Sequence, residues 1–91
     1  MTINYHFNEG DILEEVSDYI DSTYSQHYVG KGGTQATDLI ISAGHGEGFC
    51  LGNILKLASR YGKKSGKNRA DLMKIVHYAI IMLNINEENK I

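Results

Sequence analysis

The sequence predicts an all-α protein: a compact four-helix domain with glycine-rich loops that assembles into a homo-oligomer. Three observations lead to this prediction. Apolar residues recur at helical spacing in four separate segments, as in amphipathic helices. The chain has no Pro and ten Gly, so its helices are uninterrupted and Gly forms its turns. Finally, a chain of 91 residues makes one domain (1–91) whose core is small enough to favour association.

The first helix is expected over residues 8–24, after an N-terminal arm of residues 1–7. Asn8 is a suitable N-cap, and acidic side chains such as Asp11 favour the positive end of the helix dipole. One apolar stripe runs along this helix: Ile12, Leu13, Val16, Tyr19, Ile20 and Tyr24. A glycine-rich loop is expected at residues 30–33.

The second helix is expected over residues 34–43, with Thr34 as its cap. Three glycines within residues 44–48 then predict a tight turn with positive φ or a close backbone approach. The third helix is expected over residues 49–61 and should stop at Gly62 in the C′ position. Its expected core face consists of Phe49, Leu51, Ile54, Leu55 and Ala58.

A basic loop at residues 63–67 leads to the fourth helix, and residues 85–91 form a polar tail. Asn68 is expected to cap this helix, with Asp71 completing the reciprocal capping pair three residues later. The residues expected to face inward from the fourth helix are Leu72, Ile75, Val76, Ala79, Ile80 and Leu83.

Charge is strongly polarised along the chain. Seven of the nine Lys and Arg residues fall between positions 56 and 74, together with a single acid, Asp71. Residues 1–55 contain eight acids and one base, Lys31. A local cationic region concentrates phosphate-bearing ligands through its field, so the sequence predicts an anion site there.

The candidate site starts on the third helix, where Asn53, Lys56 and Arg60 stand at i, i+3 and i+7 and therefore share one face. Arg can bind phosphate through two parallel hydrogen bonds, and Lys acts as a point charge. The predicted phosphate-binding residues are Asn53, Lys56, Arg60, Lys63, Lys64, Lys67, Arg69 and Lys74. The alternative is a solvated basic loop that pairs with acids of the first helix.

Four further side chains could contact a nucleotide base: Tyr28, Tyr61, His77 and Tyr78. Aromatic rings can stack on bases, although packing in a core or an interface is the alternative for each. The net charge of −2 argues against nucleic acid as the partner, because nucleic-acid binders are usually basic proteins. A small phosphorylated ligand fits better.

The residue pattern lacks common catalytic and metal motifs. Residues 62–68 do not fit a phosphate-binding P-loop, because three residues instead of four separate the glycines and Asn68 replaces the magnesium-binding hydroxyl. We therefore predict no catalytic residue, no metal and no cofactor. The single Cys50 is interpreted as a buried thiol in a reducing compartment. The absence of an apolar run of about 18 residues or a secretory signal predicts a cytoplasmic protein that does not span a membrane.

Several motifs resemble the phage SaV-like family of small bacteriophage proteins. They are His27-Tyr28, Asp38 with Ile40 and Ile41, the run from Phe49 to Lys56, Arg60, Lys63 or Lys64, Asp71-Leu72, Lys74 and Tyr78. The resemblance covers residues 27–83 and implies a phage origin, a helical fold, the cytoplasm of the bacterial host and a link to nucleotides, since the same module is found within a phage nucleotide kinase.

From these patterns we expect a non-catalytic nucleotide-binding protein, which a phage could use to sequester a host nucleotide signal and counter a defence system. The first alternative is a nucleoside monophosphate kinase or a nucleotide phosphohydrolase. A kinase of ordinary design needs a triphosphate cradle and magnesium ligands, and the sequence shows neither plainly. The second alternative is a module that binds a host protein.

Overall fold

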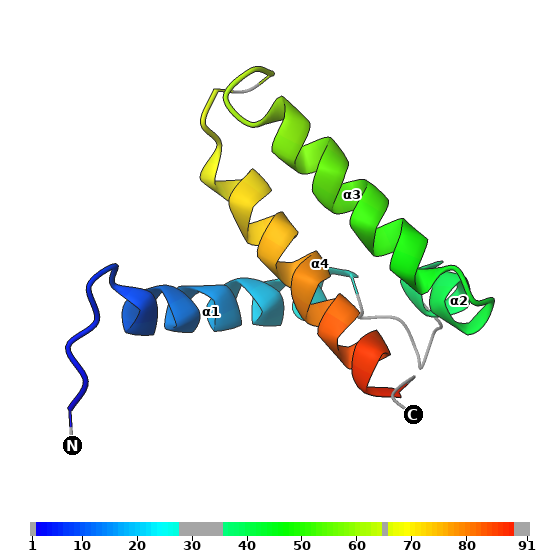
Figure 1. Ribbon diagram of the computed structural model, residues 1–91, viewed down its shortest axis with the longest axis horizontal. Coiled ribbons are helices and arrows are strands. Elements are labelled where there is room, and N and C mark those ends of the chain that lie inside the picture. Colours follow the sequence, from blue (N-terminus) through cyan, green and yellow to red (C-terminus); the bar gives the residue numbers. More distant parts are fainter. Residues whose placement is uncertain (1, 28–35, 65, 89–91) are drawn as a thin grey trace. The chain divides into compact units, whose positions relative to one another are not determined.

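The computed structural model describes residues 2–27, 36–64 and 66–88, and these residues are all-α, as the sequence predicts (Figure 1). The helices are α1 (Glu9–His27), α2 (Ala36–Ser42), α3 (Gly46–Arg60) and α4 (Arg69–Glu88). The chain divides into two compact units, Met1–Lys31 and Gly32–Ile91. The first unit contains α1 and the second contains the other three helices. The expected loop at residues 30–33 and its neighbouring cap Thr34 lie outside the described residues.

The first unit consists of α1 and the arm that precedes it. Phe7 donates its backbone N–H to Glu9 Oε1 at 2.9 Å, and the Asn8 carbonyl accepts from the Ile12 N–H at 3.0 Å. Asn8 has a φ of 61°, so it precedes the helix in the left-handed region instead of the extended conformation usual for an N-cap. The ring of Tyr5 packs on Gly10, where a Cβ would lie 3.3 Å from it. Local contacts therefore position the arm at the start of α1.

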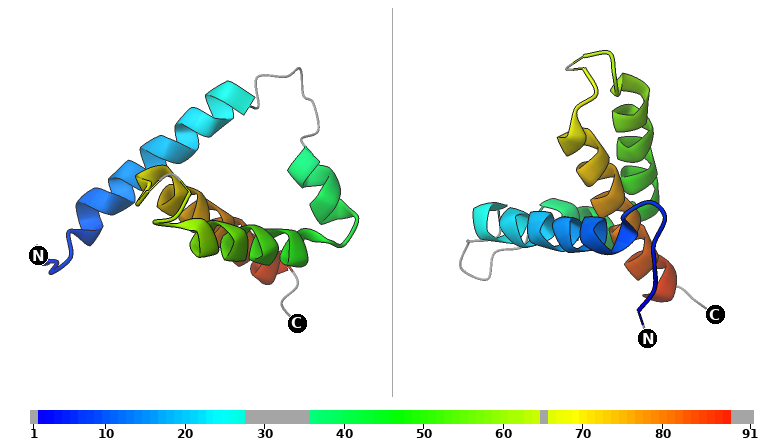
Figure 2. Two further views of the ribbon diagram at one scale, coloured as in Figure 1. Left: turned by 90° about the horizontal axis from the view of Figure 1, so that it is seen from above. Right: turned by 90° about the vertical axis from the view of Figure 1, so that its left-hand side faces the viewer.

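In the second unit, α3 and α4 form an antiparallel hairpin, and α2 packs against α3 (Figure 2). Helix α2 ends in a Schellman motif, in which the His45 N–H binds the Ile40 carbonyl and the Gly44 N–H binds the Ile41 carbonyl. The chain then turns directly into α3. Among the described residues, no helix has the length and apolar character that crossing a membrane requires.

The three helices of this unit meet at Gly46. A Cβ there would lie 2.8 Å from Ile85 Cδ1 of α4 and 2.9 Å from Ile41 Cγ1 of α2. The expected close backbone approach within residues 44–48 is therefore confirmed. The expected helix start was wrong, because α3 begins at Gly46 and includes Glu47 and Gly48 in its first turn.

The face of α3 that packs on α4 differs from the predicted one. Its buried residues are Gly46, Cys50 and Leu57, and Asn53 and Arg60 lie on the same stripe. Three residues that were expected in the core are exposed: Leu51, Leu55 and Ala58. Polar residues can occupy a buried face when their polar atoms are hydrogen-bonded, and both Asn53 and Arg60 have such partners.

Helix α4 faces α3 through residues spaced seven apart. Asp71 pairs with Arg60, the Tyr78 ring packs edge-on against Phe49, and Ile85 approaches Gly46. Most of the residues expected to face inward are exposed instead: Leu72, Val76, Ala79, Ile80 and Leu83. Helix α4 is apolar on two faces, and the hydrophobic periodicity indicated the one that does not meet α3.

The expected polar tail at residues 85–91 begins too early. Helix α4 continues to Glu88, and Ile85 is buried with 9% of its surface exposed. The Asn84 Nδ2 atom donates to Glu88 Oε2 at 2.8 Å, one turn further on. Packing of Ile85 at the helix junction thus extends α4 into a segment whose composition is mostly polar.

Candidate functional site

The basic end of the hairpin is organised by an ion pair between its two helices. Arg60, in the last turn of α3, donates from Nη2 to Asp71 Oδ1 of α4 at 3.0 Å. The Asp71 side chain is only 5% exposed, whereas that of Arg60 is 32% exposed. Asp71 was expected to bind the Asn68 N–H in a capping pair, and that expectation was wrong, because this N–H binds the Gly66 carbonyl.

Two glycines close the loop that joins the helices. Gly62 and Gly66 have φ values of 82° and 70°, in the left-handed region that L side chains rarely adopt. The Gly62 N–H binds the Gly66 carbonyl at 2.9 Å. Asn68 then caps α4 as predicted, with Oδ1 accepting from the Ala70 N–H at 2.8 Å. These contacts bring Gly62 and Gly66 together between the end of α3 and the start of α4.

Six cationic side chains of the predicted site are exposed at this end of the hairpin. They are Lys56, Lys63, Lys64, Lys67, Arg69 and Lys74. Lys56 precedes Arg60 by about one helical turn, and Lys74 follows Asp71 by about one turn. Asp71 is the only acid within residues 56–74 and it pairs with Arg60, so cations outnumber acids in this segment.

Asn53 is not part of this cluster. Its Nδ2 atom donates to the Phe49 carbonyl one turn earlier in α3, at 2.9 Å. Asn53 also precedes Arg60 by seven residues, which is about 10 Å along the helix axis. The side-chain amide of the half-buried Asn53 is therefore hydrogen-bonded within α3, and Asn53 does not lie with the lysines of the loop.

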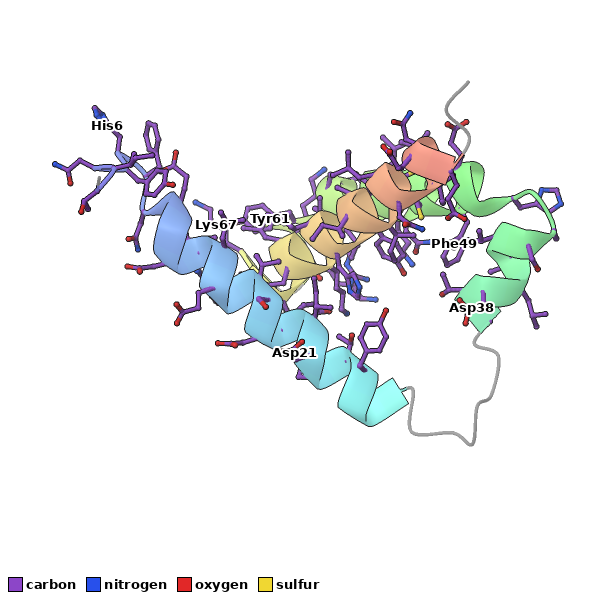
Figure 3. The ribbon with its side chains drawn as sticks, turned by 90° about the horizontal axis from the view of Figure 1, so that it is seen from below. His6, Asp21, Asp38, Phe49, Tyr61 and Lys67 are labelled. Atoms are coloured by element: carbon purple, nitrogen blue, oxygen red, sulfur yellow. The ribbon has the colours of Figure 1, made fainter. Side chains whose placement is uncertain are left out.

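Of the predicted base-contacting residues that the structure describes, only Tyr61 lies at the basic end of the hairpin. Tyr61 is half-buried at the C-cap of α3, at the same end of the hairpin as Lys67 (Figure 3). Tyr78 instead packs on Phe49, with ring centroids 5.8 Å apart and planes at 79°. His77 and Tyr78 follow Asp71 by about two turns of α4. Tyr28 lies outside the described residues.

The hairpin interior holds the ionisable groups with shifted pKa values. Cys50 is fully buried, as predicted, and burial raises the pKa of its thiol. Burial also raises the pKa of Tyr78, with a smaller contribution from the nearby Cys50, and burial lowers the pKa of His77. Each shift favours the neutral form of its group, and a raised thiol pKa is the opposite of what an activated cysteine nucleophile requires.

A cavity of about 610 Å³ lies at the opposite end of the hairpin, where sequence reasoning proposed no site. Three carboxylates line it, from Asp38, Glu47 and Glu88. A phosphorylated ligand would meet like charge there, so the cavity is unsuited to the predicted ligand. Among the described residues, no group of three or more His, Cys, Asp or Glu is placed to hold a metal ion.

The fold and the site define a small all-α protein with an ion-paired helical hairpin that is cationic at one end. A family model described as "Protein of unknown function (DUF3310)" matches residues 22–80, so the chain belongs to that family. The match includes α2, α3, the basic loop and the first half of α4. No curated protein and no solved structure matches the chain.

Proposed function

We propose that this protein binds a small phosphorylated ligand, a nucleotide, at the basic end of the α3–α4 hairpin without converting it. One observation carries the proposal: five exposed lysines, Lys56, Lys63, Lys64, Lys67 and Lys74, belong to the segment in which Arg60 pairs with the only acid, Asp71. A cluster of lysines of this kind attracts multivalent anions and offers several charged hydrogen-bond donors to phosphate oxygens.

A nucleotide is favoured over free phosphate because an aromatic ring stands beside the lysines. Tyr61 is half-buried at the start of the basic loop, so part of its ring remains accessible for stacking on a base. A nucleotide is favoured over nucleic acid because the whole chain has an isoelectric point near 6.0. A local cationic site on an acidic protein suits a compact ligand better than a long polyanion.

Binding without turnover is favoured by the position of Asp71. A general base must reach the proton that it removes, and the Asp71 side chain is 5% exposed and tied to Arg60. The carboxylates of the acidic cavity lie at the other end of the hairpin. If the resemblance to phage proteins reflects a common role, the protein would sequester a host nucleotide signal and so counter a defence system in the bacterial cytoplasm.

Calorimetric titration against mono-, cyclic and dinucleotides, with inorganic phosphate as a further ligand, tests the binding proposal. The informative variant is Lys63→Gln/Lys64→Gln, because both side chains are exposed and their loss should not disturb the hairpin. Lys63→Arg/Lys64→Arg is the matched control that keeps the charge. We expect at least tenfold weaker binding in the Gln variant, equivalent to about 1.4 kcal/mol, and near wild-type binding in the Arg variant. Equal affinity in all three proteins contradicts the proposal.

Turnover is tested separately by incubating the protein with ATP, magnesium and each nucleoside monophosphate, and with cyclic dinucleotides. Chromatography should recover the ligands intact. Steady phosphoryl transfer or hydrolysis that is lost in a folded Asp71→Asn variant would instead establish the enzyme alternative. Binding that survives in Asp71→Asn without any turnover supports a role limited to binding.

A further inference from the structure

Helix α4 carries an apolar ridge that the other described helices of its own unit, α2 and α3, leave exposed. Four large side chains form it, with exposed fractions of 40% for Leu72, 38% for Val76, 40% for Ile80 and 67% for Leu83. Their spacing places them on one face, about 150° around the helix from the residues that meet α3. Helix α3 therefore cannot cover this ridge, and contiguous apolar surface of this kind marks a contact site for another protein surface.

The two ends of the ridge carry opposite charges. Arg69 stands at its N-terminal end and Glu87 at its C-terminal end, 18 residues apart. Eighteen residues make five turns, so both side chains lie on the ridge face, about 27 Å apart along the axis. Each already takes part in an interaction within the chain. A guanidinium with five N–H donors and a carboxylate with two oxygens can accommodate a further contact.

This pattern is self-complementary for two antiparallel copies. Arg69 and Glu87 are symmetric about position 78, and so are Val76 and Ile80. Leu72 and Leu83 are symmetric about nearly the same point. A twofold axis there would place every member of a pair opposite its partner on the second copy, which is the requirement of an isologous interface. Parallel helices would instead bring like charges together at both ends of the ridge.

The rest of the hairpin is also basic at the end where Arg69 lies and acidic at the end where Glu87 lies. Its loop end carries the exposed lysines, and its other end carries the carboxylates of Asp38, Glu47 and Glu88 around the cavity. Figure 3 shows this separation, with Lys67 at one end of the hairpin and Asp38 at the other. In an antiparallel pair, the basic end of each copy lies nearest the acidic end of its partner, which adds electrostatic complementarity to the apolar contact.

We propose that the exposed ridge of α4 packs antiparallel against the same ridge of a second copy of this chain, around a twofold axis near residue 78. Among the described residues of the second unit, the buried apolar side chains are few: Cys50, Leu57, Met73 and Ile85. Covering the ridge adds apolar contacts that a small chain needs for stability. The four apolar residues of the ridge do not include the lysines of the loop, so dimerisation can be tested in variants that leave those lysines unchanged.

Light scattering after size exclusion, at micromolar concentration, tests the contact. The wild type should have twice the chain mass of 10.1 kDa. Ile80→Glu should be monomeric, whereas Leu55→Glu, on the exposed face of α3, should remain dimeric. Circular dichroism checks that both variants remain helical. A monomeric wild type, or a dimer that Leu55→Glu disrupts and Ile80→Glu does not, overturns the proposal.

Charge exchange supplies a test that leaves the apolar ridge intact. Arg69→Glu and Glu87→Arg should each weaken dimerisation, and the double variant should restore it at least partly. Orientation is tested by oxidative cross-linking, since Leu72→Cys should link to Leu83→Cys when the two proteins are mixed. Cross-linking of Leu72→Cys with itself alone would overturn the antiparallel arrangement, because these positions lie about 18 Å apart along the axis in the proposed dimer.

Discussion

Arg60 and Asp71 join the end of one helix to the beginning of the next, with Nη2 and Oδ1 3.0 Å apart. Arg60 lies in the last turn of α3, where a cation suits the negative end of the helix dipole. Asp71 lies in the first turn of α4, where an anion suits the positive end. The pair therefore combines two favourable dipole interactions with a direct hydrogen bond. It links the last turn of α3 to the first turn of α4 beside the connecting loop.

Loss of Arg60 should destabilise the protein, because a nearly buried carboxylate would lose its partner. We expect Arg60→Ala to lower the free energy of unfolding by about 1–3 kcal/mol, towards the lower value since Arg60 is partly exposed. Urea unfolding of Arg60→Ala, Asp71→Ala and the double variant measures the coupling between the residues. Lys56→Ala, one turn earlier and exposed, is the control and should change little. Additive effects of the two single changes would contradict a direct interaction.

The turn after α3 should require glycine at position 62, because its backbone is in the left-handed region. Its φ of 82° is unfavourable for any residue with a Cβ, so Gly62→Ala should lower the free energy of unfolding by about 1–2 kcal/mol. Gly52 is the matched control, because it is exposed within α3 and a Cβ there would have no atom within 4 Å. Gly52→Ala should raise stability by about 0.5–1 kcal/mol. Thermal unfolding compares the two, and changes of the same sign would contradict this account.

Gly46 and Gly48 form a second matched pair, in the first turn of α3. A Cβ at Gly46 would come within 3 Å of Ile85 and Ile41, whereas one at Gly48 would have nothing within 4 Å. Gly46→Ala should therefore push α2 and α4 away from α3 and destabilise by about 1–3 kcal/mol. Gly48→Ala should be neutral or stabilising, as for other exposed helix positions. A Gly46→Ala variant as stable as Gly48→Ala would contradict close packing of the three helices at Gly46.

The presence of the four described helices and of the glycine turns could be predicted from the sequence, because both depend on local residue chemistry. Asn68 and Gly62 marked the start of α4 and the end of α3, and they act there as expected. The choice of buried face could not be predicted, because α3 and α4 carry apolar residues on more than one side. The approach of α4 to Gly46 decides which side of α3 is covered, and that contact joins residues far apart in the sequence.

Only the exposure and clustering of the candidate site's residues could be predicted from the sequence, for the same reason. The charged residues cluster in the sequence, so the exposed lysines of the basic end could be found without a structure. The pairing of Arg60 with Asp71 was missed, because Asp71 also fitted a capping pattern with Asn68. An available signal was the position of these opposite charges on either side of a loop that two glycines close. Helix spacing already separates Tyr78 from Asp71 by about two turns, whereas the packing of Tyr78 against Phe49 was not indicated by any local pattern.

Stability should depend on pH through His77. Burial lowers the pKa of this side chain from its ordinary value of 6.5, so the folded protein takes up the proton at lower pH than the unfolded chain does. The unfolded state therefore binds more protons below about pH 6.5, and stability falls as the pH falls. The contribution of neutral His77 to the free energy of unfolding is fully present above pH 6.5. It is lost progressively as the pH falls towards the lower pKa of His77 in the folded state. Unfolding midpoints of wild type and His77→Gln across this range measure it, because other titrating groups act in both proteins and cancel in the difference. The wild type should lose stability relative to His77→Gln on acidification, and parallel curves would show that His77 is not buried in the neutral form.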